Sequence, residues 1–209
     1  YYVMGGFFSV LTTAFPAIMG QPRFLQLSQT LVLALFLVIP LRRGALRHAA
    51  GVLALWLVVQ LTLMAALVWL APGRVEQAIP GGFELRAALL EWIFAVGPLP
   101  QKIAPPVLAQ LAELAAVALG SLLTGGLIGV WFIVRTANLA GFAAGSLASA
   151  LGGVMGFLLS LPLWTLARLA GYSGLTLLLA EPLLRRQWSA SRFWRLRRNP
   201  LILCLALIV

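Results

Sequence analysis

Residues 51–71 read GVLALWLVVQLTLMAALVWLA, and this stretch decides the class of the protein. It contains no charged side chain, and Gln60 and Thr62 are its only strongly polar residues. A helix needs about 20 apolar residues to cross the hydrocarbon core of a bilayer. The stretch therefore predicts a transmembrane helix.

The composition of the whole chain supports the same class. Of its 209 residues, 62% are hydrophobic and 10% are charged, and the mean hydropathy is +1.01. A soluble domain usually carries about 25% charged residues, so this chain has too few polar groups to cover the surface of a water-soluble fold. We predict an all-α integral membrane protein: a polytopic bundle of six to seven transmembrane helices with one short interfacial or re-entrant helix.

Charged residues and prolines divide this single transmembrane domain, residues 1–209, into spans. Residues 1–20 lack a basic region and a small-residue cleavage site, so they predict a first span and not a signal peptide. The last apolar run is about half as long as a span needs, so we expect a truncated span there. The predicted spans are residues 1–20, 24–41, 51–71, 107–134, 139–164, 169–184 and 200–209.

The outer segment 72–106 between the third and fourth spans is the least regular part of the chain. Six prolines interrupt it, and proline removes a backbone donor and clashes with the preceding helical turn. Between them, residues 83–96 predict a helix of about 14 residues, too short to cross a membrane. Its Glu84 and Glu91 are seven residues apart and share one polar stripe on a mostly apolar helix. This pattern favours a helix in the membrane interface or a re-entrant element against other helices.

Basic residues are concentrated in two of the predicted connections, 42–50 and 185–198. If the spans alternate, these connections and Arg135 lie on one side of the membrane and carry ten basic residues, against five on the other side. Connections rich in arginine stay on the cytoplasmic side. We therefore predict that 42–50 and 185–198 are cytoplasmic, and that the protein lies in a bacterial inner membrane or a related energy-transducing membrane.

The net charge of +10 has two interpretations, nucleic-acid binding and contact with anionic lipids. The arginines flank apolar spans, and within 185–198 they are interleaved with tryptophans, which is typical of anchors at lipid headgroups. We expect membrane lipids with anionic headgroups as partners at the cytoplasmic face, and no nucleic acid. The predicted headgroup-binding residues are Arg185, Arg186, Arg192, Arg195, Arg197, Arg198, Trp188 and Trp194.

Small residues recur every four positions between residues 120 and 156, and residues four apart stack on one helix face. Small residues let two helices approach closely in lipid, so the pattern predicts tight packing around a short hairpin at residues 135–138. The alternative is that the small faces line a path, a lipid groove or a sliding gate. The two series comprise Ser121, Gly125, Gly129, Gly141, Gly145, Ser149 and Gly153.

Ionisable groups inside spans are costly, so they are the first candidates for function. Glu113, beside Gln110, either meets water or Lys102 at the interface or binds a proton or cation within the bundle. Arg135 either caps the cytoplasmic end of its helix, where a cation complements the helix dipole, or faces the bundle. Asn138 is expected to cap the following helix. The candidate residues of a substrate or ion path are Glu113, Gln110, Arg135 and Asn138.

Two further charged residues have structural interpretations. Glu181 precedes Arg185 by one helical turn, which predicts an ion pair with Arg185 and Arg186 at the inner interface. Arg168 is expected to anchor the outer end of a span.

The residue counts disfavour most enzyme classes. The chain has no aspartate, one histidine and one cysteine, so we predict no catalytic constellation, no metal site and no cofactor. A lipid-modifying enzyme is the weakest alternative, because phosphoryl or glycosyl transfer usually recruits aspartates. The favoured hypothesis is a non-catalytic membrane subunit, a permease-like transport component for a lipid, small solute or ion that works with partner subunits. The alternative is a structural or assembly subunit of a larger membrane complex, respiratory or photosynthetic, and both imply other membrane subunits as partners.

Overall fold

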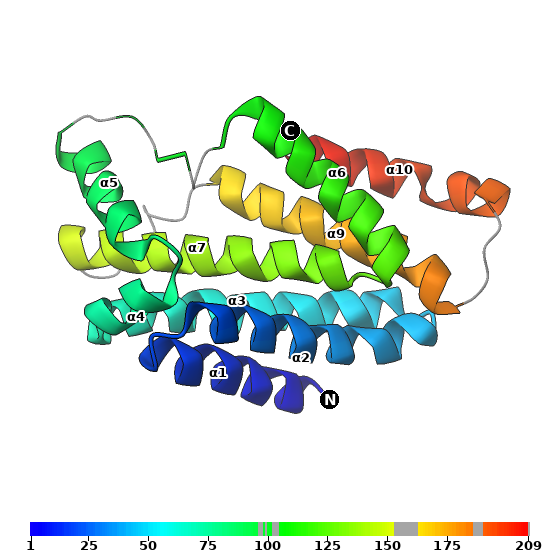
Figure 1. Ribbon diagram of the computed structural model, residues 1–209. Helices are drawn as coiled ribbons and strands as arrows, with labels where there is room; N and C mark the ends of the chain where they lie inside the picture. The colour runs from blue at the N-terminus through cyan, green and yellow to red at the C-terminus, as the bar shows by residue number, and fades with distance from the viewer. Residues whose placement is uncertain (96–97, 99, 102–104, 153–162, 186–189, 209) are drawn as a thin grey trace.

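The computed structural model describes residues 1–95, 98, 100–101, 105–152, 163–185 and 190–208. These residues form nine α-helices and no strand (Figure 1), which confirms the predicted all-α class. The helices are α1 (Tyr2–Ile18), α2 (Pro22–Arg42), α3 (Leu46–Leu70), α4 (Pro72–Ala78), α5 (Gly82–Phe94), α6 (Val107–Thr124), α7 (Leu127–Leu151), α9 (Leu163–Arg185) and α10 (Ala190–Ile208).

The long helices run back and forth along one direction (Figure 1). The α2–α3 and α6–α7 connections, the end of α9 and the start of α10 lie at one end of the bundle, on the right of Figure 1, and α4 and α5 lie at the other end. Arg185, at the end of α9, is therefore at the same end as the arginine-rich α2–α3 connection. A Cβ added to Gly44, in the α2–α3 connection, would lie 2.9 Å from the guanidinium carbon of Arg185, at the end of α9.

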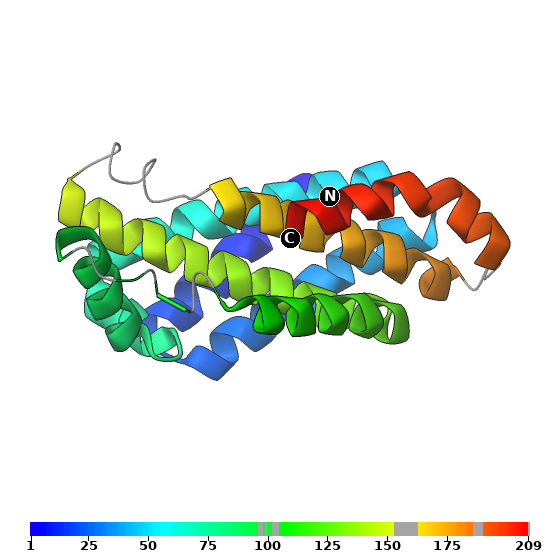
Figure 2. The ribbon, with the colours of Figure 1, turned by 90° about the horizontal axis from the view of Figure 1, so that it is seen from above.

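Helices α3 and α7 form the centre of the bundle. Their mutual contact is the most extensive in the described structure, and α1 and α2 pack on α3 while α6 and α9 pack on α7. Helix α9 lies between α6 and α10 (Figure 2). Both α6 and α9 begin beside the middle of α7 (Figures 1 and 2). These two helices therefore lie along only part of the length of α7.

Four of the described helices, α2, α3, α6 and α7, are long and apolar enough to cross a membrane, as an integral membrane protein requires. Helix α1 is apolar but has 17 residues. Helices α9 and α10 are interrupted by charged residues, among them Arg168, Glu181 and Arg197. The predicted count of six to seven spans is therefore not confirmed.

The position of the α6–α7 hairpin differs from the prediction. Residues 135–138, predicted to form the turn between two spans, lie inside the continuous helix α7. The chain turns instead at Gly125 and Gly126, which have φ values of +64° and +97°. Glycine adopts this left-handed conformation without the steric cost that a Cβ imposes. Arg135 and Asn138 therefore do not cap helix ends, and the predicted spans 107–134 and 139–164 become α6 and α7 with a boundary ten residues earlier.

The outer segment contains the short helix predicted for residues 83–96, observed as α5, Gly82–Phe94. Leu85 and Leu89 of α5 are buried and belong to one cluster with Phe142 and Leu147 of α7. Glu84 and Glu91, which form the polar stripe, remain exposed. The preceding helix α4 holds Glu76, which forms an ion pair of 2.5 Å with Arg86 of α5.

The predicted connection 185–198 is mostly helical. Helix α9 ends at Arg185, and α10 begins at Ala190 and continues without interruption past Pro200. Glu181 pairs with Arg185 at 3.1 Å, as predicted, and also with Arg197 of α10 at 2.6 Å. This carboxylate ties α9 to α10. Of the other predicted headgroup residues, Arg192, Arg195, Arg198 and Trp194 lie on α10, and Arg186 and Trp188 lie outside the described residues.

Candidate functional site

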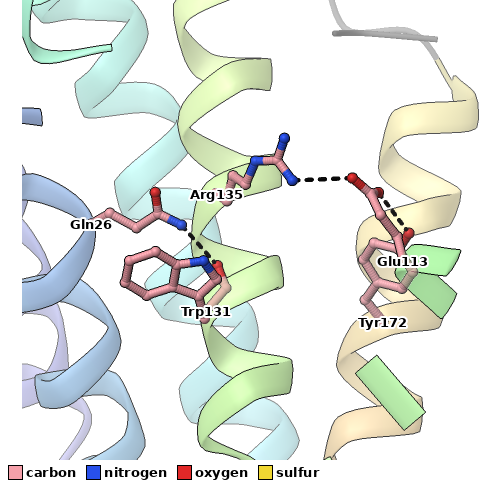
Figure 3. Close-up of polar contacts among 5 residues, drawn as sticks. All are labelled: Gln26, Glu113, Trp131, Arg135 and Tyr172. Carbon is pink, nitrogen blue, oxygen red and sulfur yellow. Dashed lines mark hydrogen bonds and ion pairs between the residues drawn. The ribbon is translucent and has the colours of Figure 1, made fainter. Parts of the chain in front are cut away.

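A charged cluster joins three helices in the middle of the bundle. The Arg135 guanidinium on α7 donates a hydrogen bond of 3.1 Å to Oε1 of Glu113 on α6. The Tyr172 hydroxyl on α9 donates to the other carboxylate oxygen of Glu113, at 3.3 Å (Figure 3). The structure thus brings together two of the four predicted path residues, Glu113 and Arg135, and adds Tyr172, which the sequence did not single out.

The depth of this cluster follows from the helix geometry. Arg135 lies eight residues after the start of α7 and sixteen before its end, which corresponds to about 12 Å and about 24 Å along the axis. Glu113 lies at a similar level, eleven residues before the end of α6. The side chain of Arg135 is nevertheless 47% exposed, and that of Glu113 is 24% exposed. An arginine that is half exposed far from both helix ends is the most unusual feature of the apolar helices.

Two cavities adjoin Arg135. The larger has a volume of about 390 Å³ and lies between the start of α2, the residues that follow α4 and the middle of α7. The smaller, about 60 Å³, lies between α6, α7 and α9. Arg135 and Leu139 line both cavities, so they separate the two spaces. Glu113 lines only the smaller cavity, and Asn138 lines only the larger one.

The larger cavity is amphipathic. Its wall is apolar at Leu25, Ile79 and Leu139 and polar at Arg135 and Asn138. It also includes Gln26, whose side-chain amide reaches the Trp131 carbonyl on α7 at 3.5 Å (Figure 3). This arrangement suits a molecule with one polar and one apolar part.

Arg168, five residues after the first residue of α9, lies on the wall of the smaller cavity. Its role as an anchor at the outer end of a span stays a prediction. The residue is only 8% exposed. Its Nε atom and the Thr165 hydroxyl, one turn earlier on α9, have no hydrogen-bond partner among the described residues. Buried polar groups normally form hydrogen bonds. These two atoms of the cavity wall form none with the described residues.

A second polar group crosses the bundle next to the charged cluster. Gln29 on α2 donates to Thr13 on α1 at 2.8 Å, and Asn138 on α7 donates to Gln29 at 2.8 Å. Gln60 on α3 donates to Asn138 at 2.8 Å and accepts from the Trp56 indole at 3.1 Å. The chain of hydrogen bonds therefore links α1, α2, α7 and α3. All three amides are buried, and amide side chains within long apolar helices are the sequence signal that could have found them.

The remaining predicted path residue, Gln110, does not join the cluster. Its side-chain amide donates to the Pro105 carbonyl at 2.7 Å, one turn back along the chain. Gln110 lines neither cavity. Its geometry is that of a local contact at the start of α6.

The small residues of α7 face other helices of the same chain. A Cβ on Gly145 would lie 2.6 Å from the Ala65 carbonyl oxygen of α3, and one on Gly141 would lie 2.8 Å from Cβ of Met64. A Cβ on Gly129 would lie 2.2 Å from the Ser121 hydroxyl oxygen, across the hairpin. Gly125 forms the turn, Ser149 is exposed, and Gly153 lies outside the described residues. These faces are covered by α3, α6 and α9 and do not line either cavity.

Within the part of the chain that the structure describes, no group of three or more His, Cys, Asp or Glu side chains lies close enough together to hold a metal ion. The site is therefore a pairing of charged and hydroxyl groups between two cavities. The sequence matches no known protein family, and no characterised protein or solved structure is significantly similar to it.

Proposed function

We propose that the chain is a non-catalytic integral membrane subunit of a transport system, a permease-like bundle of six to seven spans that moves a lipid, small solute or ion with partner subunits. The observation that carries the proposal is the Arg135–Glu113 pair, in which Arg135 lines both cavities and Glu113 lines the smaller one.

The charged groups of this pair are costly to place in a membrane. An arginine at the centre of a membrane helix costs roughly 2.5–3.5 kcal/mol on insertion scales. The ion pair with Glu113 offsets part of this cost, but the partly exposed side chains leave both groups outside the packed core. Ionisable residues at this depth usually face a cavity and mark the path of a substrate or ion. The adjoining cavities support that role here.

A second candidate is a structural or assembly subunit of a larger membrane complex, respiratory or photosynthetic. The observation that favours it is the network of Gln29, Asn138 and Gln60, whose linked hydrogen bonds stiffen the α1–α2–α3–α7 half of the bundle. The glycine faces do not add to it, because other helices of the chain already cover them.

Water access to the cavities separates the two candidates without knowledge of the substrate. Cys204 is the single cysteine, so a Cys204→Ala background allows one cysteine to be introduced at a time. Leu139→Cys places a thiol on the wall shared by both cavities. The matched control is Leu35→Cys on α2, an apolar residue with 68% exposure that lines neither cavity.

A charged, membrane-impermeant thiol reagent is then added to sealed vesicles. We expect Leu139→Cys to be labelled, because a transport path holds water, and Leu35→Cys to stay unlabelled in lipid. Labelling of Leu139→Cys only after detergent denaturation would contradict the transport proposal. Copurification of the native protein supplies the partner: an ATPase subunit supports transport, and a redox subunit supports the structural role.

A further inference from the structure

The smaller cavity carries an excess of positive charge. Its ionisable wall residues are Arg135, Arg168 and Glu113, so two cations face one carboxylate. Glu113 is already engaged by Arg135 and by the Tyr172 hydroxyl. No ion-pair partner of Arg168 exists among the described residues. Among the residues that the structure describes, one positive charge in this cavity therefore has no counter-charge.

The uncompensated charge is buried. Arg168 is more than nine-tenths removed from solvent, and its Nε atom lacks a partner within the described structure. Thr165 is 7% exposed, and its hydroxyl is likewise unpartnered there. Both residues line the same cavity. A buried charge without a counter-charge is strongly unfavourable, so a group that supplies negative charge and accepts hydrogen bonds would stabilise this wall.

We infer that the smaller cavity binds an oxyanion group, a carboxylate or a phosphate, between Arg168, Arg135 and Thr165. Guanidinium groups match the geometry of these anions and form short, charge-assisted hydrogen bonds with them. The Thr165 hydroxyl supplies a further donor. The volume of about 60 Å³ is about four to six times what a single water requires, which suits a group of a few heavy atoms.

The oxyanion comes either from a free small anion or from the headgroup of an anionic lipid. The larger cavity shares Arg135 and Leu139 with the smaller one and has apolar walls, so it offers room for the apolar part of a lipid. This inference rests on the proposed function only in identifying the bound anion as the transported substrate. The binding site itself stands on the charges and cavities.

The test measures the thermal unfolding midpoint of the purified protein in a neutral detergent. One arm titrates acetate and phosphate in place of chloride at constant ionic strength. The other arm compares mixed micelles with phosphatidylglycerol against micelles with phosphatidylcholine. We expect a saturable rise of the midpoint in at least one arm. Saturation by free anions identifies a free substrate, and a response to phosphatidylglycerol alone identifies a lipid headgroup.

Two variants assign the response to the site. Arg168→Gln should abolish the rise, and Thr165→Val should weaken the apparent affinity about tenfold through the loss of one hydrogen bond to a charged group. Thr165→Val keeps the volume of the side chain and removes a hydroxyl without a partner in the described structure. Thr165→Val should therefore fold. If Arg168→Gln does not fold, Thr165→Val alone shows whether the anion binds in the smaller cavity. The matched control is Thr62→Val on α3, whose hydroxyl only contacts its own helix and whose response should equal that of the wild type.

The inference is overturned if no oxyanion, free or lipid-borne, shifts the midpoint of the wild type, or if Thr165→Val responds like Thr62→Val. The two experiments distinguish a failure of this inference from a failure of the transport proposal. Labelling of Leu139→Cys without anion binding retains transport and removes the anion site. Anion binding without labelling retains the site and removes transport.

Discussion

The close approach of α3 and α7 is open to a direct test at Gly145. A Cβ at this position would lie 2.6 Å from the Ala65 carbonyl oxygen, whereas ordinary van der Waals contact starts at 3.4 Å. The Gly145→Ala variant therefore has to move the two helices apart locally by about 0.8 Å, the difference of these distances. The obstacle is a backbone atom of a neighbouring helix, which cannot rotate away as the end of a side chain can.

The expected cost follows from two opposing terms. Overpacking of a well-packed interface costs about 1–3 kcal/mol, and replacing a helical glycine by alanine gains about 1 kcal/mol of helix propensity. Gly6→Ala in α1 provides the matched control, because a Cβ at Gly6 meets nothing within 4 Å. Both variants gain the same helix propensity, so the difference between their free energies of unfolding measures the steric clash alone. We expect Gly145→Ala to be less stable than Gly6→Ala by about 1–3 kcal/mol.

Thermal unfolding of both variants in the same detergent measures this difference. For a chain of this size, 1 kcal/mol corresponds to about 2–4 °C in the unfolding midpoint, so the two midpoints should differ by about 2–12 °C. Equal midpoints for Gly145→Ala and Gly6→Ala would refute the close contact between α3 and α7. A small but equal gain in both would lead to the same conclusion, since it would reflect helix propensity alone.

Four further outcomes are expected. Asn138→Ala removes one hydrogen bond from each of the buried amides Gln29 and Gln60 and should lower the free energy of unfolding by about 1–3 kcal/mol; unchanged stability in the same unfolding assay would contradict the network. Glu181→Gln leaves two partly exposed arginines unpaired and should cost about 1–3 kcal/mol, an effect that high salt should reduce; a loss that salt does not alter would contradict an ionic link. Glu113→Gln should slow the flux of the transported substrate in reconstituted vesicles, and unchanged flux would exclude a role for this carboxylate in transport. Arg47→Cys and Glu84→Cys, in the Cys204→Ala background, should react with an impermeant reagent from opposite sides of the membrane, and reaction from the same side would overturn the predicted orientation.

The apolar helices could be predicted because their signal is local. A run of about 20 apolar residues identifies α3 without any tertiary information, and the predicted ends of the proline-bounded α5 lie within two residues of the observed ones. The order of the helices also placed the two arginine-rich segments at one end of the bundle, as observed (Figure 1). Such features depend on neighbouring residues in the chain.

The sequence predicts the α6–α7 turn at the wrong residues. The polar residues Arg135 and Asn138 lie inside α7 and form hydrogen bonds with distant partners. Arg135 and Asn138 resemble a boundary when polarity alone is considered. In the structure, Arg135 meets Glu113, 22 residues away, and Asn138 meets Gln60 and Gln29, 78 and 109 residues away. No local pattern predicts such pairs. The adjacent glycines at 125 and 126 were the local signal for the turn, since paired glycines are typical of turns.

The polar groups at mid-depth differ in how completely they are satisfied, and this difference bears on function. On the side of α1, α2 and α3, each amide in the network both donates and accepts a hydrogen bond, and the helices pack around these amides. On the side of α6 and α9, Arg135 remains half exposed and Arg168 lacks a partner within the described structure, beside a cavity. A chain under selection for stability alone would gain from neutral, apolar side chains at the second place, because replacing buried charges by packed apolar groups is often stabilising. Local violations of packing and pairing rules tend to occur at functional sites. This contrast agrees with the proposal that an anion binds between α6, α7 and α9, while the hydrogen-bond network holds α1, α2 and α3 against α7.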